Sequence, residues 1–150
     1  MKQVDFITRF YPDAEVAGQT FGINPVVILA QAILESGWGE SVLSKVHNNF
    51  FGITAYGTPN EYWHGCRVSL QDDKMKFRKY SDARNSFLDY ARLIRQVYPR
   101  AAEMSYSPES FAKEIAYSRY ISEINGDNRE EYRRALCKLC RQINTKITTL

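Results

Sequence analysis

The chain has 150 residues, enough for one domain with a hydrophobic core, and its 44% hydrophobic and 25% charged residues are typical of a globular protein. A net charge of +3 is too small to indicate a nucleic-acid-binding protein. No run reaches the roughly eighteen apolar residues of a membrane span. His47, His64 and the three cysteines lack the spacing of metal ligands. We therefore expect no metal, cofactor, nucleic-acid partner or membrane insertion, and a monomer spanning residues 1–150 as one domain.

The first fifteen residues contain no apolar core of a signal peptide. Three explanations stay open: the protein works in the cytoplasm, it is exported by another route, or the chain is a domain of a longer protein.

The first predicted elements are two short helices. Phe6, Ile7 and Phe10 have helical spacing, and Pro12 is expected to end that helix. A second short helix is predicted to run through Phe21 and to stop at Gly22.

The next predicted helix is the most apolar part of the chain. Asn24 is a good N-cap and Pro25 a good first helical residue. Residues 26–34 are apolar almost all round, so we expect this helix to be buried on most sides. Gly37 and Gly39 are expected to end it.

Residues 50–80 have a different character, because glycines and Pro59 divide them into short pieces. Strands are predicted at Tyr62–Trp63, at residues 67–70 and at residues 75–80, with a turn over residues 71–74. This segment predicts a small β-hairpin or sheet.

Helices return after residue 80. Ser81 is a possible cap for a helix that carries Phe87 and Tyr90 on its apolar face, and "SPESF" at 107–111 starts another helix. A last helix is predicted from about Asn128, and its CxxC at 137–140 indicates two small residues on one face, with a metal or redox role as the alternative. The predicted class is α+β, mainly α, with a β-lobe at about 53–80 and a cleft beside it.

Glu35 is a lone acid near the end of the apolar helix. A negative charge at a helix C-terminus is disfavoured by about 0.3–1 kcal/mol when exposed, and apolar neighbours such as Leu34 and Trp38 also disfavour the anion. Both effects raise the pKa, so Glu35 is a candidate general acid that donates a proton to a leaving oxygen. The alternative is an ordinary helix-end residue paired with Lys or Arg.

Four separated blocks resemble the glucosaminidase domains of glycoside hydrolase family 73, which include flagellar peptidoglycan hydrolases and autolysins. The blocks are "AQAILESGWGES" (30–41), "HNNFFGI" (47–53), "FRKYSDARNSFLDYARLI" (77–94) and, in divergent form, "YISEINGDNREEYRRAL" (120–136). The resemblance covers about residues 5–143. It implies a lysozyme-like fold in which an α-lobe and a small β-lobe flank a substrate groove. It also implies hydrolysis of the β-1,4 bond after N-acetylglucosamine in peptidoglycan glycan strands, with Glu35 as general acid.

The second carboxylate has several candidates, because the family's acid motif on the hairpin is absent here. Alignment from Trp63 forward and from Phe77 back favours Asp73 or Asp72, with Glu61 as a further candidate and a solvated turn as the alternative. The resemblance also allows a mechanism in which the substrate's 2-acetamido group assists and no second acid is needed.

The resemblance further implies a tyrosine near the acid, which is Tyr120, or Tyr117 if the alignment slides by three. Trp63 and Trp38 are candidate sugar platforms, and core packing is at least as plausible for Trp38. Asn49 is expected to be mainly structural, and Phe51 to shape the floor of the substrate site.

Two competing functions stay open. The first is cleavage on the muramic acid side, as a muramidase or lytic transglycosylase with the same fold. The second is a wall-binding module without activity. A phage endolysin, a delivered antibacterial effector and an excised autolysin domain are all compatible with the sequence, and each acts on the cell wall from the periplasm or the outside.

Overall fold

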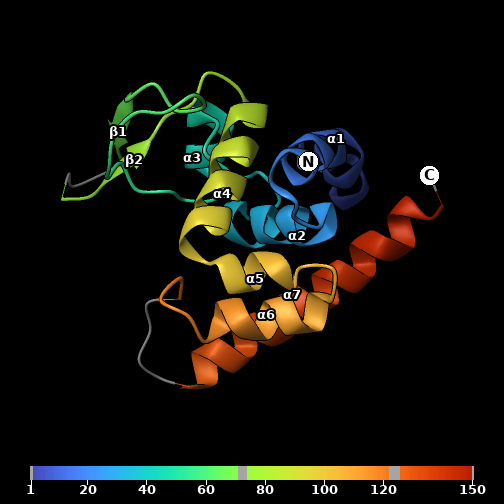
Figure 1. The fold of residues 1–150 in the computed structure, drawn as a ribbon. Coiled ribbons are helices and arrows are strands. Elements are labelled where there is room, and N and C mark those ends of the chain that lie inside the picture. The colour runs from blue at the N-terminus through green and yellow to red at the C-terminus, as the bar shows by residue number, and fades with distance from the viewer. Residues whose placement is uncertain (1, 71–73, 122–125, 150) are drawn as a thin grey trace.

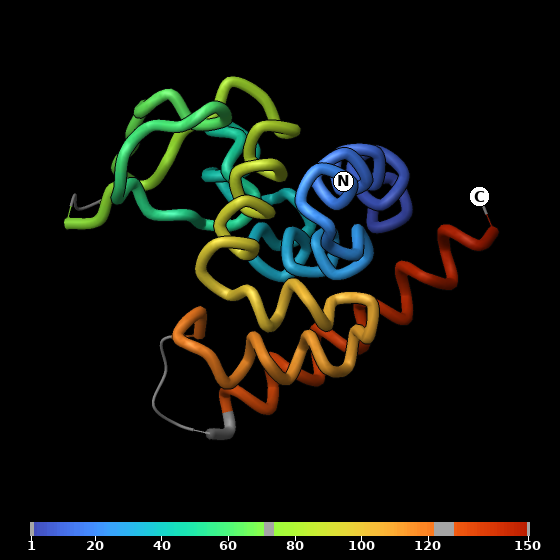
Figure 2. The backbone as a smooth tube through the Cα atoms, viewed as in Figure 1, coloured from blue at the N-terminus to red at the C-terminus, as the bar shows by residue number. Residues whose placement is uncertain are grey.

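The computed structural model describes residues 2–70, 74–121 and 126–149. Its elements are α1 (Gln3–Phe21), α2 (Pro25–Ser36), α3 (Val42–His47), β1 (Arg67–Ser69), β2 (Lys76–Arg78), α4 (Ala83–Val97), α5 (Pro99–Glu103), α6 (Pro108–Ala116) and α7 (Gly126–Ile147). Figure 1 shows α2 in the middle of the molecule, with the β1–β2 hairpin projecting at one side. In Figure 2, α5, α6 and the long α7 form a layer beneath α2 and α4. The predicted class, mainly helical with a small β-lobe, is confirmed.

Helix α2 is the centre of the hydrophobic core, as its composition predicts. Its residues from Val26 to Ile33 are all buried. The Asn24 side chain accepts a hydrogen bond from the N–H of Val26, which caps the helix, and Gly37 ends it in the left-handed conformation at φ 58°. Helices α1, α4, α5, α6 and α7 all contribute side chains to the same buried cluster.

Helix α1 corrects the prediction of two short helices. It is one helix, with Pro12 in its interior. Pro12 lacks the N–H that would bond one turn back, but it is exposed, and Phe10, Ala14 and Ala17 on the other face are buried. Packing of that continuous face outweighs the lost hydrogen bond.

The β-lobe contains two of the three predicted strands. β1 and β2 pair antiparallel, with Val68 opposite Phe77, and the turn predicted between them includes residues 71–73, which lie outside the described part of the chain. The third predicted strand, Tyr62–Trp63, is wrong. The side-chain Oδ1 of Asn60 accepts the N–H groups of both residues and holds them in a turn.

The remaining helices differ from the prediction in detail. The cap of α4 is Asp82, one residue later than predicted, because its side chain accepts from the N–H of Asn85. The short helices α3 and α5 were not predicted, since six and five residues are too few to show a period. None of the described helices is long and apolar enough to cross a membrane.

A buried ionic network joins the β-lobe to α4. The Asp89 carboxylate is fully buried and accepts hydrogen bonds from Arg78 at 2.7 Å, Tyr80 at 2.5 Å, Asn60 at 3.0 Å and Arg92 at 3.0 Å. These donors lower the pKa of Asp89, although burial alone would raise it. The network therefore fixes the end of β2 and the 60–63 turn against α4.

Candidate active site

Glu35 lies in the last turn of α2, at the point where the chain leaves the core. Gly37 and Trp38 both take a φ of 58°, and the N–H of Trp38 donates to the carbonyl of Ile33 at 3.2 Å. This turn ends the helix immediately after the acid. The Glu35 side chain is consequently exposed at the end of a helix that is otherwise largely buried.

A hydrogen-bonded chain holds one oxygen of this carboxylate. The Tyr132 hydroxyl, from α7, donates to Oε2 of Glu35 at 3.0 Å, and Nε2 of Gln31 donates to the Tyr132 hydroxyl at 3.0 Å. Partial burial raises the pKa of Glu35, and the hydrogen bond from Tyr132 lowers it in part. The net direction is upward, as the sequence predicts for a general acid.

Two further phenols, Tyr120 and Tyr90, interact electrostatically with Glu35. Burial raises the pKa of Tyr120 and of Tyr90 well above the usual value, and the negative charge of ionised Glu35 raises both further. The ring of Tyr120 packs edge-on against Tyr98, with centroids 5.8 Å apart. The acid is thus hydrogen-bonded to one phenol, from α7, and interacts electrostatically with two others, from α4 and from the segment after α6.

Trp63 corrects the prediction of an open sugar platform. Its side chain is 1% exposed, and its ring N–H donates to the carbonyl of Cys66 at 2.8 Å. The guanidinium of Arg78 lies over the ring, 4.1 Å from its centroid. Both the ring and its polar atom are occupied inside the β-lobe, so Trp63 has no free face for a sugar.

Asn49 and Phe51 act as supports behind the site. The Asn49 amide donates to the carbonyls of Ile53 and Arg78, and its oxygen accepts from the N–H groups of Phe51 and Ile53. This is the structural role expected for Asn49. Phe51 is buried and stacks on Tyr90, with centroids 4.0 Å apart, so it supports a phenol of the site instead of offering a surface to a ligand.

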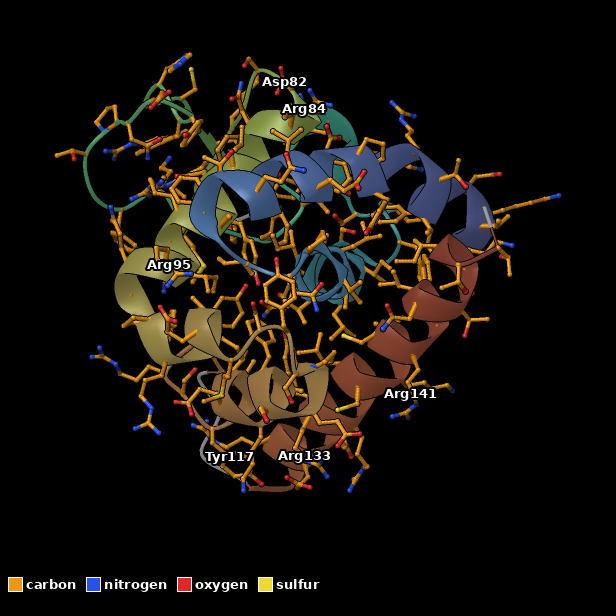
Figure 3. All side chains as sticks on the ribbon, turned by 45° about the vertical axis from the view of Figure 1, so that its right-hand side comes forward. Asp82, Arg84, Arg95, Tyr117, Arg133 and Arg141 are labelled. Atoms are coloured by element: carbon orange, nitrogen blue, oxygen red, sulfur yellow. The ribbon has the colours of Figure 1, made fainter. Side chains whose placement is uncertain are left out.

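Tyr117 and Trp38 lie at the margins of the site. Tyr117 is 50% exposed, and its hydroxyl donates to Glu130, which also binds Arg133. Figure 3 shows Tyr117 and Arg133 together at the outer edge of the molecule. Trp38 is half-buried and packs edge-on against Phe6 at 5.9 Å. Tyr117 is thus bound to Glu130, whereas Tyr120 interacts electrostatically with Glu35; the role of either tyrosine in the reaction stays a prediction.

A family model of glucosaminidases, described as mannosyl-glycoprotein endo-β-N-acetylglucosaminidase, matches residues 11–145. The chain belongs to this family. It is 32% identical over 133 residues to the peptidoglycan hydrolase FlgJ of Vibrio parahaemolyticus, covering 79% of this chain and 42% of that protein. It is also 32% identical over 103 residues to the exo-glucosaminidase LytG of Bacillus subtilis, covering 62% of this chain and 34% of that protein. The chain thus spans about two fifths of the length of the FlgJ relatives that it matches.

Solved structures agree with this assignment. The glycoside hydrolase domain of Salmonella typhimurium FlgJ superposes with a TM-score of 0.75 at 28% identity, covering 99% of this chain and 92% of that one. The lysozyme-like fold that the resemblance implied is confirmed, and so is the class of glycoside hydrolase.

The partner of Glu35 in this glucosaminidase stays a prediction. Asp72 and Asp73 lie outside the described residues. Glu61 is exposed in the β-lobe, in the turn that Asn60 organises. Among the described residues, no group of three His, Cys, Asp or Glu side chains is placed to hold a metal ion.

The sequence analysis missed both members of the hydrogen-bonded chain that ends at Glu35: Tyr132, which bonds the acid, and Gln31, which bonds Tyr132. Tyr132 stands in the fourth block and Gln31 in the first, and the sequence alone singles out neither of them. One signal was available: Gln31 and Glu35 are one helical turn apart, so a polar residue shares the face of the acid in a segment that is otherwise apolar.

Proposed function

We propose that this glucosaminidase hydrolyses the β-1,4 bond after N-acetylglucosamine in peptidoglycan glycan strands, with Glu35 as general acid. The observation that carries the proposal is the environment of Glu35: an exposed carboxyl at the end of a buried helix, hydrogen-bonded to the Tyr132 phenol, with a raised pKa. Such a carboxyl retains its proton at a higher pH than an ordinary glutamate, which a general acid requires.

The choice of peptidoglycan rests on the relatives. Those from Vibrio and Salmonella are named peptidoglycan hydrolases, and the one from Bacillus is named an exo-glucosaminidase. The description of the family model mentions mannosyl-glycoproteins instead. Named relatives that share about a third of their residues over most of the chain are the more specific guide to the substrate. We assign cleavage within the strand, as in an endo-enzyme.

In the proposed reaction, Glu35 gives its proton to the glycosidic oxygen as the bond from C1 to that oxygen breaks. The bonding electrons leave with the oxygen, and positive charge develops at C1. Either a carboxylate-activated water or the substrate's own 2-acetamido oxygen attacks C1. In the first route, the carboxylate base takes the proton of the attacking water, and Glu35 regains its own proton from solvent. In the second route, water opens the cyclic intermediate formed by the acetamido oxygen, and the proton that this water releases restores Glu35.

Two sets of residues are proposed for the attacking side. Asp73 or Asp72, and secondarily Glu61, would serve as the base. In the substrate-assisted route, Tyr120 would orient the acetamido group, which is consistent with its place near Glu35. The double variant Asp72→Asn/Asp73→Asn separates these routes, because full activity in it would remove both aspartates from the mechanism.

The proposal is tested by analysing the products of purified peptidoglycan digested with the protein. New reducing ends of N-acetylglucosamine are expected in the mass spectrum. Reducing or anhydro-muramic ends would instead identify a muramidase or a lytic transglycosylase. Glu35→Gln should abolish clearing of cell walls but retain binding to them. Wild-type protein that binds walls and clears none between pH 4 and pH 9 would support a binding module.

The site of action follows from the substrate. Peptidoglycan lies outside the cytoplasm, so we propose that the protein acts in the periplasm or outside the cell. We also retain the proposals of one domain over residues 1–150 and of a monomer. Sedimentation of the purified protein tests the second of these.

A further inference from the structure

The chain Gln31–Tyr132–Glu35 has a defined direction. The side-chain nitrogen of Gln31 can only donate, so the Tyr132 oxygen accepts from it at 3.0 Å. The single hydroxyl hydrogen of Tyr132 is then free to point at Oε2 of Glu35, also at 3.0 Å. If the amide oxygen of Gln31 faced Tyr132, it would attract that hydrogen and leave Glu35 without a donor.

The packing of α7 against α2 brings the three side chains together in this order. Gln31 and Glu35 lie one turn apart on α2, and Tyr132 comes from α7, which packs directly against α2. Gln31 is fully buried, so water does not compete with Tyr132 for its amide nitrogen. The hydrogen-bonded chain therefore runs from the core outward to the exposed acid.

We propose that Tyr132, directed by Gln31, is a positioning residue that stabilises the carboxylate formed when Glu35 gives up its proton. This inference rests on the proposed function, since it requires Glu35 to be the general acid. Tyr132 occupies Oε2 as a donor, so the acidic proton resides on Oε1, the oxygen left for the leaving group. As the proton departs, negative charge develops on the carboxylate, and the hydroxyl at Oε2 then binds an anion. A hydrogen bond to a charged acceptor is stronger than one to a neutral acid, so the contact favours the transition state.

The other groups that face Glu35 do not duplicate this contact. These groups are the phenols of Tyr90 on α4 and of Tyr120 after α6, which interact electrostatically with Glu35. Burial of the carboxyl acts in the opposite direction to Tyr132, because it raises the pKa of Glu35. The Tyr90 hydroxyl is buried without a hydrogen-bond partner among the described residues. Tyr90→Phe is therefore a matched control, because it removes a phenolic oxygen from the same cluster without removing a bond to the acid.

The test is the pH dependence of kcat/KM for Tyr132→Phe, with soluble peptidoglycan fragments as substrate. Loss of the donor leaves burial unopposed, so the acid stays protonated to higher pH. The alkaline limb should move up by about one pH unit, and the plateau should fall about tenfold. Gln31→Met, which keeps the volume but removes the donor to Tyr132, should move the limb in the same direction by less. Tyr90→Phe should leave the midpoint unchanged.

A Tyr132→Phe enzyme with the wild-type midpoint would overturn the inference, because a merely structural tyrosine lowers the rate without moving the pKa. A carbon NMR titration of the Glu35 carboxyl gives a second readout that needs no activity. A higher midpoint in Tyr132→Phe than in wild type supports the inference, and equal midpoints refute it. If wild type cleaves no peptidoglycan, the proposed function fails, whereas an active enzyme with equal midpoints refutes only the role of Tyr132.

Discussion

Substitution of Asp89 by Asn tests how strongly the β-lobe is joined to α4. The Asp89 side chain is 0% exposed, and Arg78, its partner at 2.7 Å, is 7% exposed. Asn keeps the shape but removes the charge, which leaves the Arg78 guanidinium buried without an anion. Breaking a buried pair in this way costs about 3–5 kcal/mol, and we expect that loss in the free energy of unfolding.

Urea unfolding followed by circular dichroism measures the loss, and the chain offers a matched control. Asp13 also binds an arginine at 2.7 Å, but its partner Arg84 is 51% exposed. Asp13→Asn should cost less than about 1 kcal/mol, because surface pairs contribute little. If Asp89→Asn also costs less than about 1 kcal/mol, the network does not hold the lobe in place.

The pH dependence of this loss has a defined sign. The pKa of Asp89 is lower in the folded protein than in the unfolded chain, so the carboxylate stabilises the fold above its unfolded pKa. The difference in stability between wild type and Asp89→Asn should be complete at neutral pH. It should shrink as the pH falls below about 4, where Asp89 of the unfolded chain takes up a proton first, and should be lost as the pH falls through the lower pKa of the folded state.

Three further predictions concern α1, the thiols and the acid. Gly18→Ala should destabilise the protein by about 2–4 kcal/mol in urea unfolding, because the new Cβ would lie 2.4 Å from the carbonyl oxygen of Ile23. A loss below about 0.5 kcal/mol would mean that the α1–α2 corner shifts easily to accept the new methyl group. A thiol reagent at pH 8 should modify the exposed Cys66 quickly and leave Cys137 and Cys140 unmodified. Burial raises the pKa of the Cys137 thiol and raises that of Cys140 to about 12, so rapid reaction of all three thiols would contradict the prediction. In the pH profile of wild-type kcat/KM, the midpoint of the alkaline limb should lie above the usual glutamate pKa, because activity is lost as the pH rises through the raised pKa of Glu35. A midpoint at or below about 4.3 would contradict the assignment of Glu35 as general acid.

The predictions that succeeded rest on local signals. The start of α2 follows from Asn24 and Pro25, and its end follows from Gly37. Each of these residues lies within one turn of the helix end that it determines. The position of Glu35 near the helix end follows from these bounds. β1 and β2 follow likewise from β-prone residues on either side of a turn.

The predictions that failed depend on contacts between distant parts of the chain. Pro12 is a strong local stop signal, yet the packing of the α1 face against the core keeps the helix continuous. Trp63, in a segment rich in glycine and turns, favours an exposed platform by its local sequence. Its burial depends on Arg78, fifteen residues later, whose guanidinium covers the ring and also binds Asp89. No local pattern shows which arginine will lie over which tryptophan.

The pKa of Glu35 depends both on its local sequence and on a contact with a distant part of the chain. The sequence predicts the forces that raise the pKa of Glu35, because a helix end and apolar neighbours are visible in one short segment. The opposing force comes from Tyr132, 97 residues away, and is visible only after α7 has packed on α2. The proton affinity of Glu35 is thus a balance between its own helix and another one. It follows that substitutions in α7 that tilt the helix, without touching α2 or the β-lobe, should shift the pH range of activity while the catalytic carboxyl stays in place.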